Sequence, residues 1–420
     1  MTVRFWDMAA MAQAIFASAP LALPAAPRRD RDGLTETAAP EISVERASFE
    51  EMARHRAAWS DLVLRAIEPN AFLEPDFALS AALHMPASQR PEFLLVWQGA
   101  GVEPRARLIG LLPLRRARPR FSGGLAHPWS SVYTPLGGPA IDRLDGARAV
   151  DALFDFIERH YPQSAGFALP ALTREGPLFA LLIARALVRG ARFAVMGEHE
   201  RAALRGGQSA EQALERAMSR KHRRELDRRK RRLAENANLT IRSAREGEAL
   251  REAVEWFLAL EARGWKGQRG TALLSKTSDA TFVRSALRLL AAQGKCRIDC
   301  VEIDGAPVAC GVLLTSGARS FYWKTAYDES LAHYSPGVLL TQAITEMQLA
   351  DPAIAITDSC AIANHSMIDR LWPDRIAIAD FVVALHDGAG FDRALRRARL
   401  KETLIVKAKA AVALARKKFG

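Results

Sequence analysis

The segment Tyr334-Ser335-Pro336-Gly337 stands between an expected strand and an expected helix, and its residue types suit anion binding. Ser335 can cap the helix, and Pro336 suits the first helical position, where its missing N–H is not needed. Gly337 lets another group approach the backbone closely. Free N–H groups at such a helix start bind anions, so Ser335, Pro336, Gly337 and Val338 are candidate ligands of a pyrophosphate. Simple helix capping explains the same residues.

Lys324 is a charged residue in an aromatic strand expected over Ser320–Tyr327. Strict alternation places Tyr322, Lys324 and Ala326 on one face of this strand. The opposite face takes Phe321, Trp323, Thr325 and Tyr327. An ammonium group here could neutralise an anionic substrate group or stabilise an oxyanion. A lysine that reaches solvent from a sheet edge explains the pattern equally well.

Acidic and basic side chains at the ends of elements are candidates for proton transfer. Asp358 ends an expected strand and His365 opens the next helix, which predicts an acid–base cluster, although capping explains both residues. Glu261 ends an expected helix shortly before Gly264-Trp265-Lys266-Gly267. A large aromatic side chain such as Trp265 in a loop would line a cleft or a lid.

The composition is that of a folded protein. The chain has 420 residues, 49% of them hydrophobic and 25% charged, which predicts two to three domains. No uncharged apolar run reaches the ~18 residues of a membrane helix, which excludes a polytopic membrane protein. The four cysteines form no CxxC pair, so no zinc-finger or thioredoxin pattern is present and a reducing, cytoplasmic location is expected.

The positive charge is concentrated in two stretches. The net charge is +12, and residues 215–232 and 393–418 each hold ten Lys and Arg with few acids. The rest of the chain is therefore mildly acidic. This distribution indicates a polyanionic ligand or surface for the two basic stretches.

The two halves of the chain repeat one order of elements: helix, helix, antiparallel hairpin, third strand, helix, strand, helix, strand. In the first half, the periodicity predicts the first helix over Phe49–Ile67 and the third strand over Ser130–Thr134. Residue identity between the halves is negligible, so the repeat is one of architecture. We expect two fused α+β domains of the same kind.

A basic segment, Ser209–Asn236, separates the halves and is expected to form one helix of about 27 residues, roughly 40 Å long. The predicted organisation is a disordered leader over 1–44, an N-terminal domain over 45–206, a basic linker helix over 207–236, a C-terminal catalytic domain over 237–388 and a basic helix over 389–420.

Four motifs of the second half occur together in one family. They are Glu261 with the helix end at 264–267, the hairpin around residues 304–309, the strand over 322–328 and the segment 334–337. Residues 210–385 thereby resemble the GNAT-superfamily acetyltransferase domain of CelD-like proteins of cellulose biosynthesis, which is related to the Fem-type aminoacyl transferases. The first half matches more loosely. The resemblance implies tandem GNAT-like domains, each a mixed, mostly antiparallel sheet flanked by helices, joined by a long basic helix.

This resemblance implies transfer of an acyl group from acyl-CoA, such as acetyl-CoA, to an amine or hydroxyl acceptor, without a metal. The acceptor would be a small molecule or a saccharide of polysaccharide or cell-envelope metabolism. Asp358 or Glu261 would take the acceptor's proton, and Tyr327 or Tyr334 would protonate the leaving thiolate. Backbone N–H groups of the third strand would hold the thioester carbonyl oxygen. The remaining candidates, Trp265, Lys266, Tyr322, Lys324 and His365, would bind the acceptor.

Two alternatives stay open, because the usual GNAT loop Gln/Arg-x-x-Gly-x-Gly/Ala is absent and residues 334–337 stand in its place. In the first, the donor is an aminoacyl-tRNA, as for Fem-type enzymes, and the basic linker helix contacts its phosphates. In the second, the protein is a non-catalytic GNAT-like pair on an anionic membrane surface. Its C-terminal helix, with Leu404, Ile405, Val412 and Leu414 among Lys and Arg, is typical of an interfacial helix.

Overall fold

The computed structural model describes residues 41–99, 106–115, 124–234, 238–386 and 388–419. Residues 41–420 form one compact unit. Most of the predicted leader lies outside the described residues, but Ile42 already begins a strand. No helix in the described ranges is long and apolar enough to cross a membrane.

The first half begins with a strand that the periodicity did not predict, and its expected first helix is interrupted. Its elements are β1 (Ile42–Ser48), η1 (Glu50–Ala53), α2 (Arg56–Leu64), η2 (Ala71–Leu73), α3 (Pro75–Leu83), η3 (Ala87–Gln89), β2 (Glu92–Gln98), β3 (Arg107–Leu114), β4 (Leu125–Ala126), β5 (Ala140–Ile141), α4 (Gly146–His160), β6 (Gly166–Thr173), α5 (Pro177–Val188) and β7 (Phe193–Arg205). Arg54 and His55 both bind Glu45 of β1, which holds the turn between η1 and α2 against that strand.

The second half repeats this order, again with an unpredicted first strand. Its elements are β8 (Leu239–Ala244), α8 (Gly247–Arg263), α9 (Trp265–Gln268), η5 (Leu273–Ser275), α10 (Thr277–Ala291), β9 (Cys296–Ile303), β10 (Ala306–Ser316), β11 (Arg319–Tyr327), η6 (Glu329–Tyr334), α11 (Pro336–Ala350), β12 (Ile356–Asp358), η7 (Ile368–Arg370), β13 (Asp374–Ala384) and α12 (Ala389–Phe419). β1 and β8 are edge strands with mostly half-buried or exposed side chains, so they carry no clear apolar alternation.

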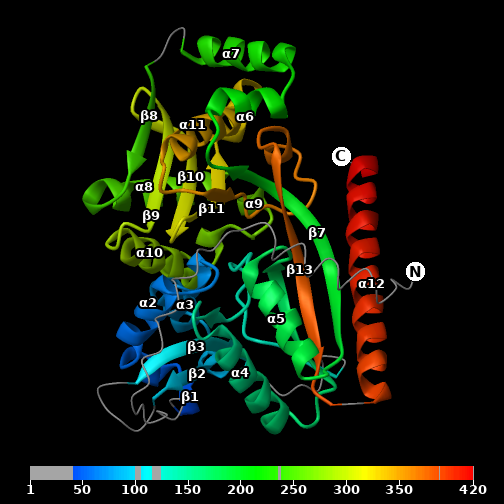
Figure 1. The fold of residues 1–420 in the computed structure, drawn as a ribbon. Coiled ribbons are helices and arrows are strands. Elements are labelled where there is room, and N and C mark those ends of the chain that lie inside the picture. The colour runs from blue at the N-terminus through cyan, green and yellow to red at the C-terminus, as the bar shows by residue number, and fades with distance from the viewer. Residues whose placement is uncertain (1–40, 100–105, 116–123, 235–237, 387, 420) are drawn as a thin grey trace, which may run out of the picture. The chain divides into compact units, whose positions relative to one another are not determined.

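The halves exchange their last strands. The larger sheet has the order β4-β6-β13-β7-β12-β11-β10-β9-β8, and a smaller sheet has the order β1-β2-β3-β5. β7 of the first half pairs with β12 of the second, whereas β13 of the second half pairs with β6 of the first. β7 and β13 also pair with each other and run side by side through the molecule (Figure 1). Each half therefore completes its sheet with the other half's final strand.

The third strand is continuous in the second half and split in the first. β11 pairs with both β10 and β12. In the first half, β4 pairs with β6 and β5 pairs with β3, and residues 127–139 between them form turns with a single bridge at Pro128. The predicted strand over Ser130–Thr134 is therefore wrong. The intervening loop instead reaches the second half, where the ring of Tyr133 stacks on Phe282 with centroids 4.9 Å apart.

One aromatic cluster joins the halves. Phe72 packs edge-on against Phe321 with ring centroids 5.1 Å apart. Phe77 packs in the same way against Phe282 and Trp323, at 5.4 and 5.6 Å. All five rings are at least nine-tenths buried, so the two halves share one core and the contact is not a mobile domain interface.

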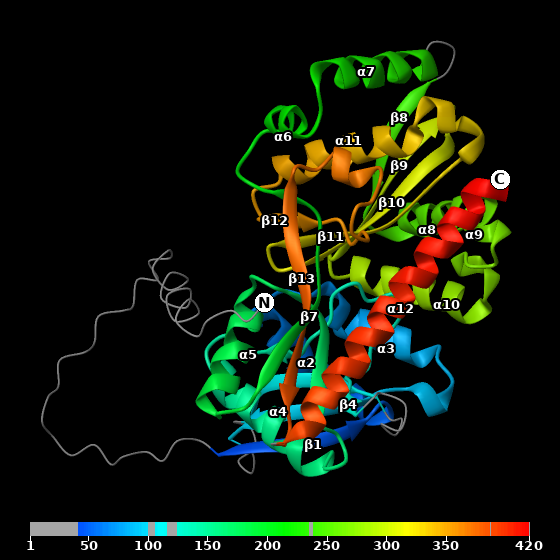
Figure 2. The ribbon, with the colours of Figure 1, turned by 90° about the vertical axis from the view of Figure 1, so that its right-hand side faces the viewer.

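The basic segment between the halves forms two helices, α6 (Ala210–Ala217) and α7 (Arg220–Ala234), where the sequence predicts one. Met218 between them is extended and buried, and the hydroxyl of Ser219 accepts from the N–H of His222, which starts a new helix. Leu226 anchors α7 in the hydrophobic cluster beneath α11. Figure 2 shows α7 beyond α11, at the end of the molecule opposite to β1.

Candidate active site

A wedge opens between β11 and β12. The two strands pair in parallel only from Arg319 to Phe321 and from Ile356 to Asp358. β11 then continues to Tyr327, while the chain after Asp358 leaves the sheet. The second half of β11 therefore presents a backbone edge without a strand partner on this side within the described residues. Such an edge can bind an extended ligand through main-chain hydrogen bonds.

A β-bulge lies at this wedge. Val312 of β10 pairs with Lys324 and Leu313 pairs with Tyr322, so Trp323 has no register partner on β10. The pairing of β11 with β12 has already ended at Phe321. In the described chain, the peptide group of Trp323 thus stands outside both strand ladders. Bulges of this kind redirect side chains and free backbone groups next to ligand sites.

The bulge also corrects the predicted faces of β11. Strict alternation predicts Tyr322 and Lys324 on one face, but the extra residue places them on opposite faces. Tyr322 packs in the cluster beneath α11, whereas Trp323 and Ala326 pack in the core beside α8 and α10. Lys324 shares this second face, because its register partner Val312 belongs to the same core.

Lys324 is the centre of a polar cluster between β11, α8, α9 and α10. Its ammonium lies 5.3 Å from the ring centroid of Trp323 and 5.7 Å from that of Tyr133. Burial and the positive charge of Lys266 lower the pKa of Lys324 to about 8, against the opposing effect of Glu261 and Asp279. The amine therefore titrates within reach of neutral pH, where a proton acceptor is most useful.

Glu261 and Lys266 form the second part of this cluster, as their sequence proximity suggests. The Nζ of Lys266 donates to one oxygen of Glu261 at 2.7 Å, and the N–H of Leu273 donates to the other at 2.8 Å. The carboxylate is almost fully buried. Both oxygens of Glu261 are engaged. Glu261 is therefore better placed to hold Lys266 and to raise the pKa of Lys324 than to act alone as a base.

Tyr133 brings the first half into the cluster. Its carbonyl accepts from the indole N–H of Trp323 at 2.9 Å. Burial and a hydrogen bond to Asp279 raise the pKa of Tyr133, so the phenol stays protonated at neutral pH. The wall of the site that faces Lys324 is thus built from both halves.

Trp265 stands at the rim of the cluster, with 46% of its surface exposed. Its backbone N–H donates to the Glu329 carboxylate of η6 at 2.8 Å, and the Arg269 guanidinium lies 4.7 Å from its ring centroid. The loop before α9 is thereby tied to the segment that leads into α11.

The start of α11 carries the candidate anion-binding residues. Ser335 has a left-handed backbone (φ 59°), and its hydroxyl accepts from Arg229 of α7 at 2.8 Å. Pro336 occupies the first turn, and Val338 donates to the carbonyl of Ser335 at 3.0 Å. A Cβ on Gly337 would lie 3.2 Å from the ring of Tyr327, so a side chain here would crowd the end of β11.

Asp358 does not reach the cluster as a free carboxylate. It is fully buried and pairs with Arg201 at 2.6 Å and Arg319 at 2.8 Å. These two guanidinium groups hold its pKa below the ordinary value in spite of burial. A carboxylate so strongly stabilised is a poor proton acceptor, so the geometry favours a structural role for Asp358 over the predicted catalytic one.

Three other candidates lie on the α11 side. The hydroxyl of Tyr322 is 3.5 Å from that of Thr341, and burial raises the pKa of Tyr322. The ring of Tyr334 lies against that of His333, with centroids 3.9 Å apart. The Nδ1 of His365 accepts from the N–H groups of Met367 and Ile368 at 3.4 Å, so this histidine caps the turn before η7. The structure does not bring Tyr322 or His365 into the Lys324 cluster.

In the first half, the described start of α4 differs from the start of α11 in carrying carboxylates. At the N-terminus of α4, Asp142 is buried and paired with Arg65, and Asp145 pairs with Arg107. Asp142 also accepts from the N–H of Leu144 at 2.7 Å. Carboxylates thus stand beside the helix N–H groups that an anion would need.

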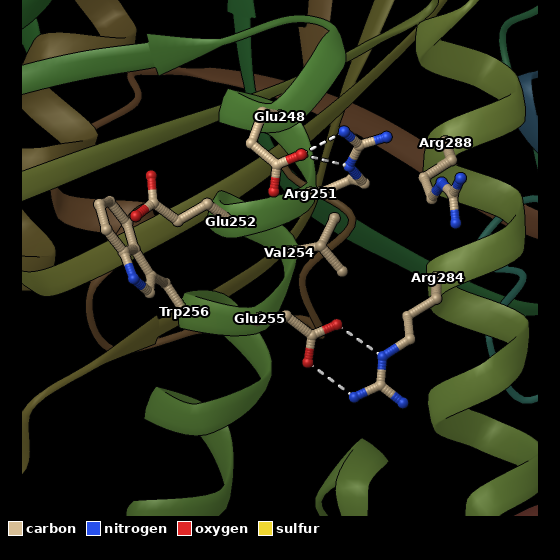
Figure 3. A pocket seen from close by; sticks show the side chains of 8 residues that line it. All are labelled: Glu248, Arg251, Glu252, Val254, Glu255, Trp256, Arg284 and Arg288. Carbon is tan, nitrogen blue, oxygen red and sulfur yellow. Dashed lines mark hydrogen bonds and ion pairs between the residues drawn. The ribbon is translucent and has the colours of Figure 1, made fainter.

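A hollow of about 430 Å³ lies elsewhere, on the outer face of α8 and α10 (Figure 3). Most of its charges are paired, since Arg251 binds Glu248, Arg284 binds Glu255 and Glu252 binds Arg242. No candidate residue from the sequence lines this hollow, so we do not assign the site to it.

Three residues of the site were missed by the sequence analysis: Tyr133, Asp279 and Arg229. Arg229 lies in the basic stretch, where charge alone did not single it out. No spacing links residue 133 with residue 324, because the split third strand of the first half brings them together. Only the fold could join them.

The comparisons with known proteins bear on this region. A family model described as an acetyltransferase (GNAT) domain matches residues 220–356. No curated protein matches the chain. The CelD-like, cellulose-related part of the resemblance thus finds no support beyond the sequence motifs.

Several solved structures are similar in outline. A structure of FemX has 10% identity, covers 77% of this chain and 95% of its own, and has a TM-score of 0.49. The C-terminal domain of a putative lysylphosphatidylglycerol synthetase from Agrobacterium fabrum has 13% identity, 84% and 96% coverage and a TM-score of 0.45. A tandem GNAT protein from the clavulanic acid pathway has 16% identity, 83% and 100% coverage and a TM-score of 0.39. Likenesses at these scores carry no argument about substrate.

The matched range contains β11 with its bulge, the start of α11, Arg229 and the side chains of Glu261, Lys266, Asp279 and Lys324. Residues 220–356 are therefore similar in sequence to the acetyltransferase domain of the GNAT superfamily.

Proposed function

We propose that the protein is an acyltransferase whose single active site lies in the second half, at the wedge between β11 and β12. The observation that carries this proposal is the bulge at Trp323 on the open edge of β11. A thioester laid along this edge would find backbone N–H groups for its carbonyl oxygen, where negative charge develops in the transition state. The first half serves as scaffold and supplies Tyr133.

The donor would be an acyl-CoA such as acetyl-CoA. Its pyrophosphate would take the helix N-terminus at Ser335–Val338, and Arg229 would add a charge-assisted hydrogen bond from α7. Because Gly337 has no side chain, the ring of Tyr327 can pack against the start of α11. The carboxylates at the start of α4 argue against a second donor site in the first half.

The acceptor would approach from the Lys324 side of β11. Its amine or hydroxyl attacks the thioester carbon, a C–N or C–O bond forms, and the C–S bond breaks. Lys324, in its neutral form, takes the proton that the acceptor loses, in place of Asp358. Tyr327 or Tyr334, both near the start of α11, would return a proton to the thiolate of CoA. The acceptor would be a compound with an amine or hydroxyl group, and we propose a saccharide.

Isothermal titration with two donors tests the seat of the pyrophosphate. Arg229→Gln should weaken acetyl-CoA binding about tenfold, since a hydrogen bond to a charged group is worth roughly 1.5–3 kcal/mol. The same variant should leave S-acetylpantetheine, which has no pyrophosphate, unchanged.

Arg228→Gln is the matched control for this titration. Arg228 lies on the same helix and pairs with the same Glu225, but it is exposed, and in the described part of the chain it is Arg229 that reaches Ser335 of α11. Its substitution should change neither Kd by more than about twofold. Equal losses for both donors in Arg229→Gln, or no binding of acetyl-CoA to the unmodified protein, would count against the proposal.

A second candidate donor, an aminoacyl-tRNA, is favoured by one observation. α7 exposes several cations beside Arg229, namely Arg220, Lys221, Arg224, Lys230 and Arg232. If tRNA is the donor, its affinity should fall steeply between 50 and 200 mM salt, and Arg224→Glu with Lys230→Glu should abolish it. Filter binding of unfractionated tRNA measures this. If tRNA binding is affected neither by the salt increase nor by the two substitutions, aminoacyl-tRNA is ruled out as the donor.

A further inference from the structure

Among the described side chains, the buried contacts between the C-terminal helix α12 and the body of the protein lie in the first turns of the helix. Phe391, Ala394 and Leu395 are buried against Val382 of β13 and neighbouring side chains. Asp392 pairs with Arg192 at 2.6 Å, beside these contacts. Figure 2 shows α12 crossing in front of the lower ends of β7 and β13 and diverging from these strands toward its own C-terminal end. These contacts therefore do not explain the composition of the helix beyond residue 398.

The outward side of this helix carries an uncovered stripe. Arg393, Arg397, Leu400, Leu404 and Lys407 follow each other at steps of four and three residues, which places them on one face of a helix. Leu400 and Leu404 are 61% and 58% exposed. A helix that needed only a solvated outer face would carry polar residues at these positions.

The flanks of the stripe are cationic. Arg396, Arg399 and Lys401 are also exposed. The acids of this part of α12 turn elsewhere: Asp392 binds Arg192, and Glu402 lies 3.7 Å from the position of a Cβ on Gly197 of β7. The outward surface thus combines two leucines with positive charge and without a competing carboxylate among the described residues from 393 to 408 that share this face.

We propose that this face of α12 docks on an anionic lipid surface. Leucine side chains between arginines and lysines can insert their apolar parts below the headgroups while the cations contact lipid phosphates. A second copy of the chain is a poor occupant, because it would bring the same cations against this face. A nucleic acid would use the cations but would leave the two leucines in water. The proposal is independent of the acyltransferase reaction.

Liposome co-sedimentation of the full chain tests this docking. The protein should sediment with vesicles of phosphatidylcholine containing 30% phosphatidylglycerol and stay in the supernatant with phosphatidylcholine alone. Leu400→Asn with Leu404→Asn should reduce the bound fraction at least fivefold. Arg393→Gln with Arg397→Gln should do the same, because both kinds of contact are required. Point variants are used because removal of the helix would uncover Leu125 and Val382, which pack against it.

Matched controls come from leucines of similar exposure. Leu64→Asn with Leu187→Asn, at 66% and 58% exposure on α2 and α5, should leave the bound fraction unchanged. Circular dichroism should show the same melting transition for both double leucine variants. Retained vesicle binding in the Leu400/Leu404 variant would overturn the proposal. Equal binding to neutral vesicles would also overturn it. So would a loss of vesicle binding in the arginine variant alone together with competition by tRNA, because that result would indicate a polyanion as the ligand of this face.

Discussion

Replacing Lys324 with Met should lower kcat/KM for acetyl transfer by about 10²–10⁴, the usual contribution of a positioned acid–base group. Met keeps the length and packing of the side chain between Trp323 and Tyr133 and removes only the amine. The measurement is CoA thiol release from acetyl-CoA with a panel of amines and amino sugars as acceptors. Titration with acetyl-CoA should give an unchanged Kd.

The pH dependence distinguishes a base from a charge. Burial and Lys266 lower the pKa of Lys324 to about 8, so the neutral amine gains population as the pH rises through that value. With Lys324 as base, kcat/KM should rise tenfold per pH unit below about 8 and level off above it. If the ammonium only held an anionic acceptor, the rate would fall over the same range.

Lys324→Arg provides the conservative control. The guanidinium keeps the positive charge but does not deprotonate in this pH range. It should therefore be as inactive as Met if Lys324 is the base, and it should restore activity if the charge alone matters. Lys324→Met is not expected to unfold the protein, because burial already disfavours the charged amine. Burial also disfavours the permanent charge of Lys324→Arg, so the folding of that variant is checked by circular dichroism. Restored activity in Lys324→Arg contradicts the assignment.

Replacing Asp358 with Asn should cost about 3–5 kcal/mol of unfolding free energy, which is typical when one partner of a buried ion pair is removed. Arg201 and Arg319 would lose the carboxylate that both share at 2.6 and 2.8 Å. Their remaining polar partners, the Pro135 carbonyl, Glu68 and the Thr173 hydroxyl, belong to the first half. In denaturant, the variant should therefore unfold with a lower free energy of unfolding than the native protein. It should still unfold in one transition, because the halves share strands and core.

An exposed pair on α2 gives the scale for this loss. Asp61, 60% exposed, binds Arg65, and Asp61→Asn should cost no more than about 1 kcal/mol. The pKa of Asp358 is lowered in the folded state, so its contribution to stability is present above the unfolded pKa of ~3.9 and is lost as the pH falls through the folded value. The difference in unfolding free energy between the native protein and Asp358→Asn should accordingly become smaller as the pH falls into the acid range. A gap of less than 1 kcal/mol at pH 7 would mean that the three side chains are not paired in solution.

Much of the local structure follows from the sequence because it depends on near neighbours. The Ser335-Pro336-Gly337 start of α11, the hairpin of β9 and β10 and the helical C-terminus are set by capping, turn and periodicity signals over a few residues. Glu261 and Lys266 stand five residues apart and meet as helix spacing suggests. The break at Ser219 is also a local signal, which the longer basic periodicity hides.

The candidate site itself depends on tertiary structure. A one-residue bulge moves Lys324 to the face opposite that of Tyr322, and no alternation pattern shows where a bulge falls. From the sequence, Asp358 is predicted to be a free carboxylate at a strand end. In the structure, the exchanged strand β7 places Arg201 beside it. Tyr133 meets Asp279 and Lys324 across a separation of more than 140 residues. The sequence by itself determined most of the element order, the helix start at Pro336 and the basic segments, because these arise from contacts within one or two turns. The strand exchange, the faces of β11 and the partners of each charge were decided by packing between the halves, because that packing alone sets which distant side chains share a buried space.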